Sequence, residues 1–263
     1  MKNKKSLGQH WLREREILLD IVRYAVDEKN VVKNTTILEI GSGLGTLTSA
    51  IFKFFDKVVA VEYDPELSNK LSGQFPGKNL TSVNADFLQF NLSTLPKNYF
   101  VIANVPYYIT SPIVQKLLTA KNRPKKIVLL VQKEVAERLA MSGGKSSILG
   151  LSANIYAKTR LGMIVPKELF VPPPKVDSQV VILDVYEKSQ LGNLSEVDFF
   201  KIVKLGFSSP RKKLVNNLTR VGKFNREELL EHLRLLSVNP NARPENLSVS
   251  EWKNLVLAIV NKK

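Results

Sequence analysis

The chain has 263 residues, 44% hydrophobic and 24% charged, which is enough to bury the core of one large domain or of a large and a small one. It contains no cysteine, which excludes disulfides and thiolate metal sites, and neither of its two histidines, His10 and His232, has the neighbours of a metal site, so we expect no metal. A formal net charge of +15 predicts a polyanionic partner.

Residues 1–12 are basic and show no helical or strand period, so we expect an arm rather than a domain element. The lysines are not followed by the apolar segment of a secretory signal, and no apolar run approaches membrane-spanning length. We therefore expect a cytoplasmic protein that does not bind membranes. Residues 13–26 place Ile17, Ile21 and Val22 on one face of a predicted helix.

Strands and helices alternate from residue 36 onward. Apolar runs typical of strands occur at 36–40, 58–62, 80–85, 100–104 and 127–131, and helical patterns follow them at 46–55, from 65, at 111–120 and at 133–140. This alternation predicts parallel βαβ units and a doubly wound, Rossmann-like α/β sheet. A helix at 146–156 and strands at 161–165 and 180–185 complete this part of the chain.

Strand patterns stop after Tyr186. Helical patterns separated by glycine, asparagine and proline follow at 198–207, 212–218, 226–235 and 249–260. The sequence therefore predicts two domains: an α/β domain over residues 1–186 and a small all-helical domain over residues 187–263.

A glycine-rich turn joins the first predicted strand to its helix, with the sequence Glu39-Ile40-Gly41-Ser42-Gly43-Leu44-Gly45. Glycines in such a turn let a ligand approach the backbone closely. The dinucleotide pattern would require a third glycine at position 46, where this chain has threonine. The shorter spacing, preceded by an acidic residue, is typical of S-adenosylmethionine binding, although an ordinary tight turn is the simpler alternative.

Acidic residues stand at the ends of three successive predicted strands: Glu39, Glu62 and Asp86. Glu62 has the spacing at which a carboxylate meets ribose hydroxyls, and Asp86 could accept a hydrogen bond from an adenine amine. Each alone could be a helix cap or a loop charge. Together they suit a cationic sulfonium cofactor and would repel a pyrophosphate.

The fourth predicted strand ends in Asn104-Val105-Pro106-Tyr107. The Asn104 side-chain oxygen and the Pro106 carbonyl could accept the hydrogens of an adenine N6 amine, while Tyr107 stacks on the base. Because nitrogen can attack first and lose its proton afterwards, no strong base is required, and the catalysis comes mainly from positioning. A strand-ending turn is the simpler interpretation of these four residues alone.

Five segments together resemble the KsgA-type ribosomal RNA adenine dimethyltransferases over nearly the whole chain. They are Lys5–Leu12, Glu39–Gly45, Asn104–Tyr107, the aromatic-proline segment Phe170–Ser178 and the basic segment Phe207–Leu218. The departures from the family pattern are small: Ser42 stands where proline is common, His10 where asparagine is frequent and Trp11 where phenylalanine is usual.

The resemblance implies S-adenosylmethionine-dependent dimethylation of two adjacent adenosines in small-subunit ribosomal RNA during ribosome assembly. It implies a class I methyltransferase sheet and a stacking role for Phe170, opposite Tyr107, on a flipped base. With the residues discussed above, the expected cofactor site comprises His10, Leu12, Glu39, Gly41, Gly43, Glu62, Asp86 and Asn104.

Two basic runs, Arg123-Pro124-Lys125-Lys126 and Arg211-Lys212-Lys213, are expected to contact RNA phosphates, although short charge runs are more often solvated surface. We expect a monomer that acts on the assembling small ribosomal subunit. Three alternatives remain: an Erm-like enzyme for large-subunit RNA, an assembly factor whose methylation is dispensable, and a nicotinamide-dependent oxidoreductase, which Thr46 disfavours.

Overall fold

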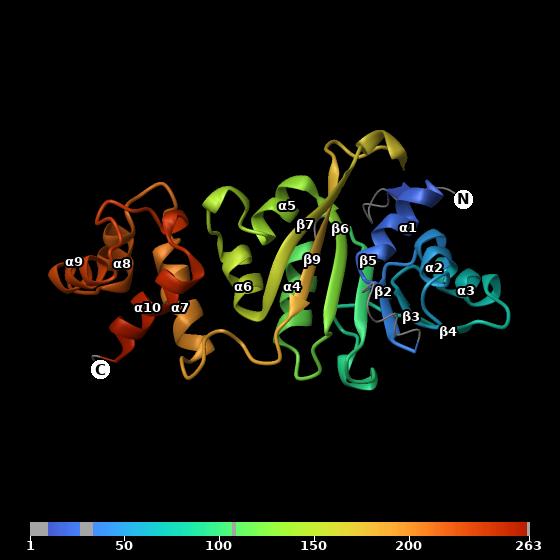
Figure 1. Cartoon of the computed structure of the whole chain (residues 1–263), viewed down its shortest axis with the longest axis horizontal. Coiled ribbons are helices and arrows are strands. Elements are labelled where there is room, and N and C mark those ends of the chain that lie inside the picture. The colour runs from blue at the N-terminus through green and yellow to red at the C-terminus, as the bar shows by residue number, and fades with distance from the viewer. Residues whose placement is uncertain (1–9, 27–33, 107–108, 262–263) are drawn as a thin grey trace. The chain divides into compact units, whose positions relative to one another are not determined.

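The computed structural model describes residues 10–26, 34–106 and 109–261, so Tyr107 and most of the segment Lys5–Leu12 lie outside the described residues. The described residues form a seven-stranded sheet (Figure 1). Its strand order is β4 (Asn79–Asn84), β3 (Lys57–Glu62), β2 (Thr36–Ile40), β5 (Phe100–Asn104), β6 (Lys126–Gln132), β9 (Ser178–Val185) and β7 (Ala157–Val165).

The first five strands in this order are parallel, as predicted, but the sheet is not parallel throughout. Strand β9 pairs antiparallel with both β6 and β7. The connection from β7 to β9 contains only a 3-10 turn (Lys167–Leu169) and the short strand β8 (Phe170–Val171). A parallel return would need a crossover of about a dozen residues or more, usually a helix, so this connection brings the chain back antiparallel.

The strand order reverses between β2 and β5, because β3 and β4 lie on one side of β2 while β5 and β6 lie on the other. In open α/β sheets, ligands bind outside the carboxyl ends of the strands at such a reversal. The fold therefore positions the ends of β2, β3 and β5 around one site.

One face of the sheet packs against helices α1 (Arg15–Arg23) and α2 (Thr46–Ile51). Leu18, Ile21 and Val22 form the buried stripe of α1 and join core residues from β2, β5, β6 and β9. The remaining helices of this part are α3 (Pro65–Gln74), α4 (Thr110–Thr119) and α5 (Lys133–Leu139).

A two-stranded ribbon ties the amino-terminal arm into the fold. Strand β1 (Trp11–Leu12) pairs antiparallel with β8, so that Leu12 lies opposite Phe170. Both of these side chains are almost fully buried. A hydrogen bond from His10 to Pro172 joins the same two segments. The arm is therefore anchored to a segment that follows it by about 160 residues in the chain.

The helical unit contains α6 (Ile148–Tyr156), α7 (Glu196–Gly206), α8 (Leu214–Gly222), α9 (Arg226–Leu235) and α10 (Val249–Val260). The chain divides into two compact units, residues 1–136 with 157–186, and residues 137–156 with 187–263. We expected one boundary near residue 187. The second unit does resume there, but residues 137–156 belong to it as well, because α6 packs against α10.

Trp252 forms the centre of the helical unit and is completely buried. A Cβ atom added to Gly206 would lie 2.4 Å from the Trp252 ring, so only glycine fits at the end of α7. Ser248 and Glu251 form a capping box that begins α10 and thereby fixes the helix that carries Trp252.

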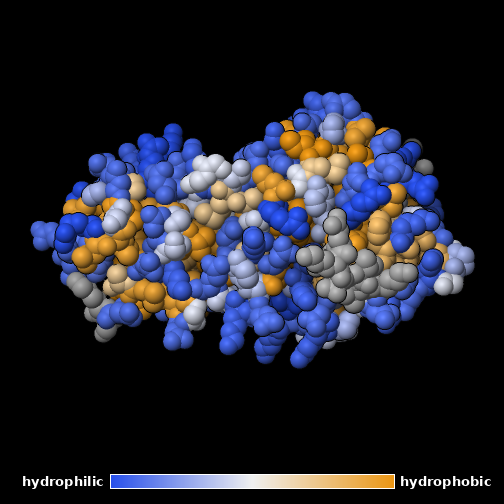
Figure 2. Space-filling view, viewed as in Figure 1, coloured by the Kyte–Doolittle hydropathy of each residue, from blue (hydrophilic) through white to orange (hydrophobic). Residues whose placement is uncertain are grey.

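Hydrophilic residues cover most of the face shown in Figure 2, with hydrophobic residues interspersed among them. Within the described ranges, no helix has both the length and the apolar character that crossing a membrane requires.

Candidate functional site

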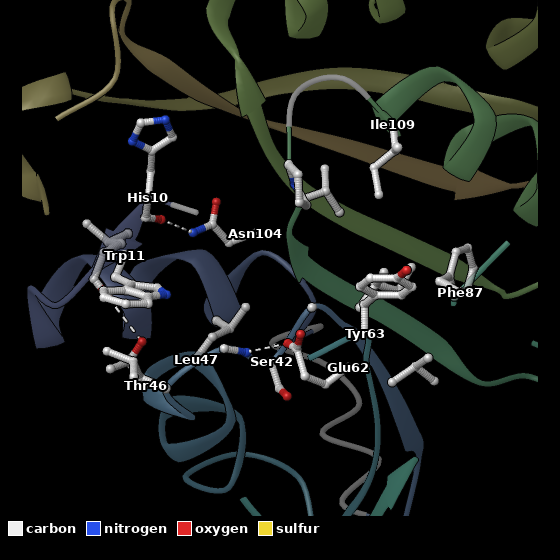
Figure 3. A pocket seen from close by; sticks show the side chains of 18 of the residues that line it. His10, Trp11, Ser42, Thr46, Leu47, Glu62, Tyr63, Phe87, Asn104 and Ile109 are labelled. Atoms are coloured by element: carbon white, nitrogen blue, oxygen red, sulfur yellow. Dashed lines mark hydrogen bonds between the residues drawn. The ribbon is translucent and has the colours of Figure 1, made fainter. Parts of the chain in front are cut away.

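A cavity of about 380 Å³ opens at the carboxyl edge of the parallel strands (Figure 3). Its volume lies within the range of roughly 300–1,000 Å³ that is usual for small-molecule sites. The wall is formed by the arm, the glycine-rich turn and the residues that follow β3, β4 and β5. Of the predicted site residues, the cavity is lined by His10, Leu12, Gly41, Gly43, Glu62, Asp86, Asn104 and Pro106.

The glycine-rich turn needs its three glycines for conformational reasons. Gly41, Gly43 and Gly45 have φ angles of +72°, +53° and +77°, a region that other L-residues rarely adopt. A Cβ atom on Gly45 would also lie 2.5 Å from the Gln74 side-chain oxygen, whereas one on Gly41 would have no atom within 4 Å. The turn therefore presents bare backbone to an open part of the cavity.

Glu62 fixes the glycine-rich turn from the end of β3. Its Oε2 accepts a hydrogen bond from the Gly43 backbone N–H at 2.8 Å, and its Oε1 accepts one from the Asp64 N–H at 2.9 Å. The carboxylate is buried yet lines the cavity. Since each carboxylate oxygen has two acceptor sites, Glu62 can hold the turn and still accept from a ligand hydroxyl.

Asp86 stands on the wall beyond β4 and is partly exposed. Its Oδ1 accepts a hydrogen bond from the Leu88 N–H at 2.8 Å, which shapes the turn over residues 86–88. Its other oxygen has no hydrogen-bond partner among the described residues. This oxygen can accept a hydrogen bond from a ligand amine.

Glu39 does not line the cavity, so the structure does not bring it together with the other predicted cofactor residues, and its role there stays a prediction. Its side chain is fully buried on the same strand face as Ile37, and its Oε2 accepts a hydrogen bond from the Thr48 hydroxyl at 2.6 Å. Burial, with a smaller contribution from the nearby Glu62 charge, raises the pKa of Glu39 to about 8. Glu39 therefore supports α2 from beneath and is mostly protonated at neutral pH.

Asn104 and Pro106 place two acceptors at the edge of the cavity. The Asn104 side-chain nitrogen donates to the His10 carbonyl at 3.5 Å, which directs the amide oxygen away from the arm (Figure 3). The Pro106 carbonyl accepts a hydrogen bond from the Ile109 N–H at 3.3 Å and keeps a second acceptor site. The Val105 N–H, bonded to the Leu130 carbonyl at 3.4 Å, holds the segment against β6.

The described part of the arm, His10 to Leu12, closes one side of the cavity and is hydrogen-bonded at both of these residues. His10 Nδ1 donates to the Pro172 carbonyl at 2.8 Å, and the Thr46 hydroxyl donates to the Leu12 carbonyl at 3.0 Å. Trp11 covers Gly43, because a Cβ atom on that glycine would lie 3.5 Å from the indole nitrogen. His10 and Leu12 thus lie on the cavity wall.

Phe170 does not line the cavity, so its stacking on a base stays a prediction that the structure does not test. The ring is only 2% exposed and packs in the core opposite Leu12, whereas the next residue, Val171, is 50% exposed. Successive side chains of a strand point to opposite sides, so the ribbon that buries Phe170 presents Val171 to solvent. Almost none of the Phe170 ring is exposed in this structure.

Sequence reasoning missed Lys116, which lies on α4. Its amino group donates to the Leu88 carbonyl at 2.8 Å and lies 5.5 Å from the centroid of the Phe87 ring. Burial lowers the pKa of Lys116, while the charge of Asp86 opposes this shift. Lys116 thus braces the turn that carries Asp86, a role that no spacing in the sequence could indicate.

Tyr63 was also missed, and here a signal existed. It directly follows Glu62, lines the cavity and is 63% exposed. An exposed aromatic ring next to a strand-end carboxylate provides a flat apolar face at the cavity rim, as Figure 3 shows for Tyr63 and Glu62.

The two basic runs differ in their surroundings. Lys126 pairs with Asp184 at 3.5 Å and begins β6, so the run over residues 123–126 lies at the amino edge of the sheet, away from the cavity. Arg211, Lys212 and Lys213 are exposed between α7 and α8, and Lys213 donates to Asn241 at 2.6 Å. Throughout the described residues, no group of three or more histidine, aspartate or glutamate side chains could hold a metal ion.

The sequence model of the family described as "Ribosomal RNA adenine dimethylase" matches residues 1–261. Among curated relatives, "Ribosomal RNA small subunit methyltransferase A" of Caldanaerobacter subterraneus is 38% identical, covering 98% of each chain. The protein of the same name from Fusobacterium nucleatum is 37% identical over 97% of each chain.

Two solved structures share the fold over nearly the full length. A dimethyladenosine transferase from Plasmodium falciparum is 28% identical with a TM-score of 0.78, covering 96% of this chain and 98% of that one. The 23S rRNA methyltransferase ErmE is 25% identical with a TM-score of 0.76, covering 95% of this chain and 99% of that one.

Proposed function

The chain belongs to the ribosomal RNA adenine dimethylase family, and we propose that it uses S-adenosylmethionine as a methyl donor. The proposed substrate is the N6 amines of two adjacent adenosines in small-subunit ribosomal RNA, each of which it dimethylates. The observation that carries the proposal is the position of two hydrogen-bond acceptors, from Asn104 and Pro106, at the edge of a cavity whose far wall is the glycine-rich turn. The names of the small-subunit relatives support the choice of substrate.

The residues of the cavity fit this cofactor. The Ser42 hydroxyl is buried on the wall without a hydrogen-bond partner among the described residues, which suits a polar ligand. The bare backbone at Gly41 leaves room for that ligand, and the Glu62 and Asp86 carboxylates favour a cation. When bound, S-adenosylmethionine supplies an activated methyl group on a cationic sulfur.

Within this proposal, Glu62 accepts from ribose hydroxyls, Asp86 accepts from an adenine amine and Tyr63 covers an apolar part of the ligand. Lys116 keeps the Asp86 turn in place through the Leu88 carbonyl. Arm residues His10 and Leu12 close the site and exclude water from it.

The target amine is a poor nucleophile because its lone pair is delocalised into the adenine ring. Asn104 Oδ1 and the Pro106 carbonyl would each accept one amine hydrogen, so that the nitrogen becomes pyramidal and its lone pair points into the cavity. Because both acceptors are tied to neighbouring backbone, they need little reorganisation when the amine arrives. Tyr107, which lies outside the described residues, is proposed to stack on the base.

Incubation with labelled S-adenosylmethionine and, separately, unmodified small subunits, large subunits and naked ribosomal RNA tests the proposal. We expect label on two adjacent adenosines of small-subunit RNA. Label confined to large-subunit RNA would instead identify an Erm-like enzyme, the alternative that the similarity to ErmE favours. Tight small-subunit binding without label would identify an assembly factor.

We further propose that the enzyme acts as a monomer in the cytoplasm, on the assembling small subunit and without a metal ion. Light scattering of the pure protein checks the monomer, for which a mass near 29.6 kDa is expected. Unchanged methyl transfer after treatment with a chelator is the expected result for a metal-free reaction.

A further inference from the structure

A second hollow, of about 200 Å³, lies in the groove between helices α1 and α2. Its wall has a basic rim and an apolar floor. The residues that line it are Arg13, Arg15, Leu18, Leu19, Thr46, Ser49, Ala50 and Lys53. No feature of the cofactor cavity or of the predicted basic runs accounts for it.

The groove follows from the spacing of side chains on the two helices. Thr46, Ser49, Ala50 and Lys53 occupy positions i, i+3, i+4 and i+7 along α2 and its last turn, so they share one side of it. The small Ala50 leaves space above the floor, which is completed by the buried Leu18 of α1. Two packed helices therefore leave a recess instead of a filled contact.

The charges around the hollow are all of one sign. Arg13, Arg15 and Lys53 are exposed at its rim, and none of the described residues that line it is acidic. The intervening Glu14 and Glu16 belong to the same stretch of sequence but do not line it. None of the three cations forms an ion pair with another described residue.

Three cations gathered around a recess repel one another, and an anion in the recess removes that repulsion. The planar guanidinium groups of arginine match the oxygens of a phosphate, to which they can donate two parallel hydrogen bonds. The Ser49 hydroxyl at the rim adds a neutral donor. The hollow thus has the chemistry of a phosphate site.

The hollow adjoins the cofactor cavity. Leu18 and Thr46 line both, and the Thr46 hydroxyl donates a hydrogen bond to the Leu12 carbonyl of the arm. An RNA strand whose base enters the cavity edge has its flanking phosphates on the neighbouring surface. This position favours a backbone phosphate over a free anion.

We propose that the hollow formed by Arg13, Arg15 and Lys53 binds a backbone phosphate of the RNA substrate, next to the nucleotide that is methylated. This inference rests on the proposed function and adds a contact to it. Its role is to anchor the strand on the α1 and α2 side of the cavity, where the charge pattern of the sequence shows no basic run.

The double substitution Arg15→Gln/Lys53→Gln tests the contact against the matched control Lys70→Gln/Lys97→Gln, which removes the same charge from exposed lysines of the same unit. The measurement is the Kd for a small-subunit RNA hairpin over a series of KCl concentrations. Each lost phosphate contact lowers the slope of log Kd against log [KCl] by roughly 0.7–0.9. Because the hollow is proposed to hold one phosphate, we expect a decrease of about 0.7–0.9 for the test variant and a clearly smaller decrease for the control.

The Kd for S-adenosylmethionine, measured on the same preparations, should stay within about twofold of wild type, which also shows that the variant is folded. If the double variant is unstable, the single substitutions Arg15→Gln and Lys53→Gln should each give about half the decrease. Equal salt slopes for test and control would overturn the proposal. A large loss of cofactor affinity in a folded variant would also overturn it, by assigning the hollow to the cofactor carboxylate.

The two proposals fail in different ways. If wild-type protein transfers no label to small-subunit RNA, the proposed function fails, whatever the salt slopes are. If wild type transfers label but the Arg15→Gln/Lys53→Gln variant keeps the control slope, the function stands and the phosphate site fails.

Discussion

Asn104 is the residue on which the proposed chemistry depends most directly. Asn104→Ala removes the side-chain acceptor for the amine. Within the protein it breaks only one hydrogen bond, the long one to the His10 carbonyl. We expect the rate of methyl transfer to fall by about 10²–10³-fold, comparable with the loss of a preorganised polar group in other active sites. The Kd for S-adenosylmethionine should change by less than about fivefold, since a 3.5 Å bond contributes little.

Single-turnover transfer to RNA and equilibrium binding of the cofactor separate these two effects. Asn104→Asp is the informative companion, because it keeps an oxygen acceptor and should retain more activity than the alanine variant. Near-normal dimethylation by Asn104→Ala would rule out positioning of the amine by this side chain.

Glu39 should make stability depend on pH. Its pKa is about 8 in the folded chain and near 4.5 when exposed, so the folded state holds its proton more tightly. Its contribution to stability is therefore greatest below about pH 4.5 and is lost as the pH rises towards 8. Glu39→Gln keeps an acceptor for the Thr48 hydroxyl but does not titrate. In this variant, the decrease in the free energy of unfolding between these pH values should therefore be smaller by an amount on the order of a few kcal/mol.

Urea unfolding at several pH values between 5 and 8 measures this effect, with the exposed Glu168→Gln as the control. Glu39→Gln should flatten the pH dependence and Glu168→Gln should not. The same decline in both variants would mean that Glu39 is already ionised in the folded protein.

Asn217 fixes the basic turn between α7 and α8. It is 1% exposed, and its side-chain nitrogen donates to the Gly206 carbonyl at 2.6 Å and to the Ser209 carbonyl at 2.9 Å. Asn217→Ala leaves both acceptors without their donor. We expect a loss of about 1–3 kcal/mol in the free energy of unfolding, together with weaker RNA binding by the turn that carries Lys212.

The exposed neighbour Asn216 provides a matched control for this substitution. Asn216→Ala breaks only a surface hydrogen bond with Arg226 and should change stability by less than about 0.5 kcal/mol. Chemical denaturation gives both values. Similar effects of the two substitutions would show that the turn does not depend on Asn217.

At the scale of elements, the sequence predicted the strands and most helices because their apolar runs are uninterrupted and well punctuated. It could not predict that β9 would run antiparallel, since an apolar run buried on both faces carries no direction. For the same reason it could not assign a face to Glu39, whose strand is apolar on either side of it. The burial of Phe170 depends on the ribbon with β1, a pairing of distant segments that has no local pattern.

The candidate site was predictable where it depends on strand ends and glycines. Glu62, Asp86 and Asn104 end or follow successive parallel strands, and this topology brings them to one cavity. Lys116 and the hollow between α1 and α2 were not predictable, because each joins side chains from elements far apart in the sequence.

At the scale of the whole molecule, we expect the basic residues to contribute unequally to RNA binding. Lys125 lies at the amino edge of the sheet, roughly 20 Å from the cavity edge if β6 spans about 3.3 Å per residue. Lys212 is exposed on the turn that Asn217 holds. We expect Lys212→Gln to lower the salt slope of RNA binding by roughly 0.7–0.9 and Lys125→Gln to leave it nearly unchanged.

Kd values for the small-subunit RNA hairpin at several KCl concentrations distinguish the two lysines. Because both substitutions remove one charge from an exposed lysine, net charge alone predicts equal effects. An equal change for Lys125→Gln and Lys212→Gln would mean that RNA senses the overall charge and not particular contacts.

The pairing of β1 with β8 also sets the order in which the protein can be completed during synthesis. His10 and Leu12 are made before their partners around Phe170 and Pro172, which follow about 160 residues later. At roughly 5–20 residues per second, this interval is on the order of ten to thirty seconds. His10 and Leu12 can therefore close the cavity only after most of the α/β unit has been translated.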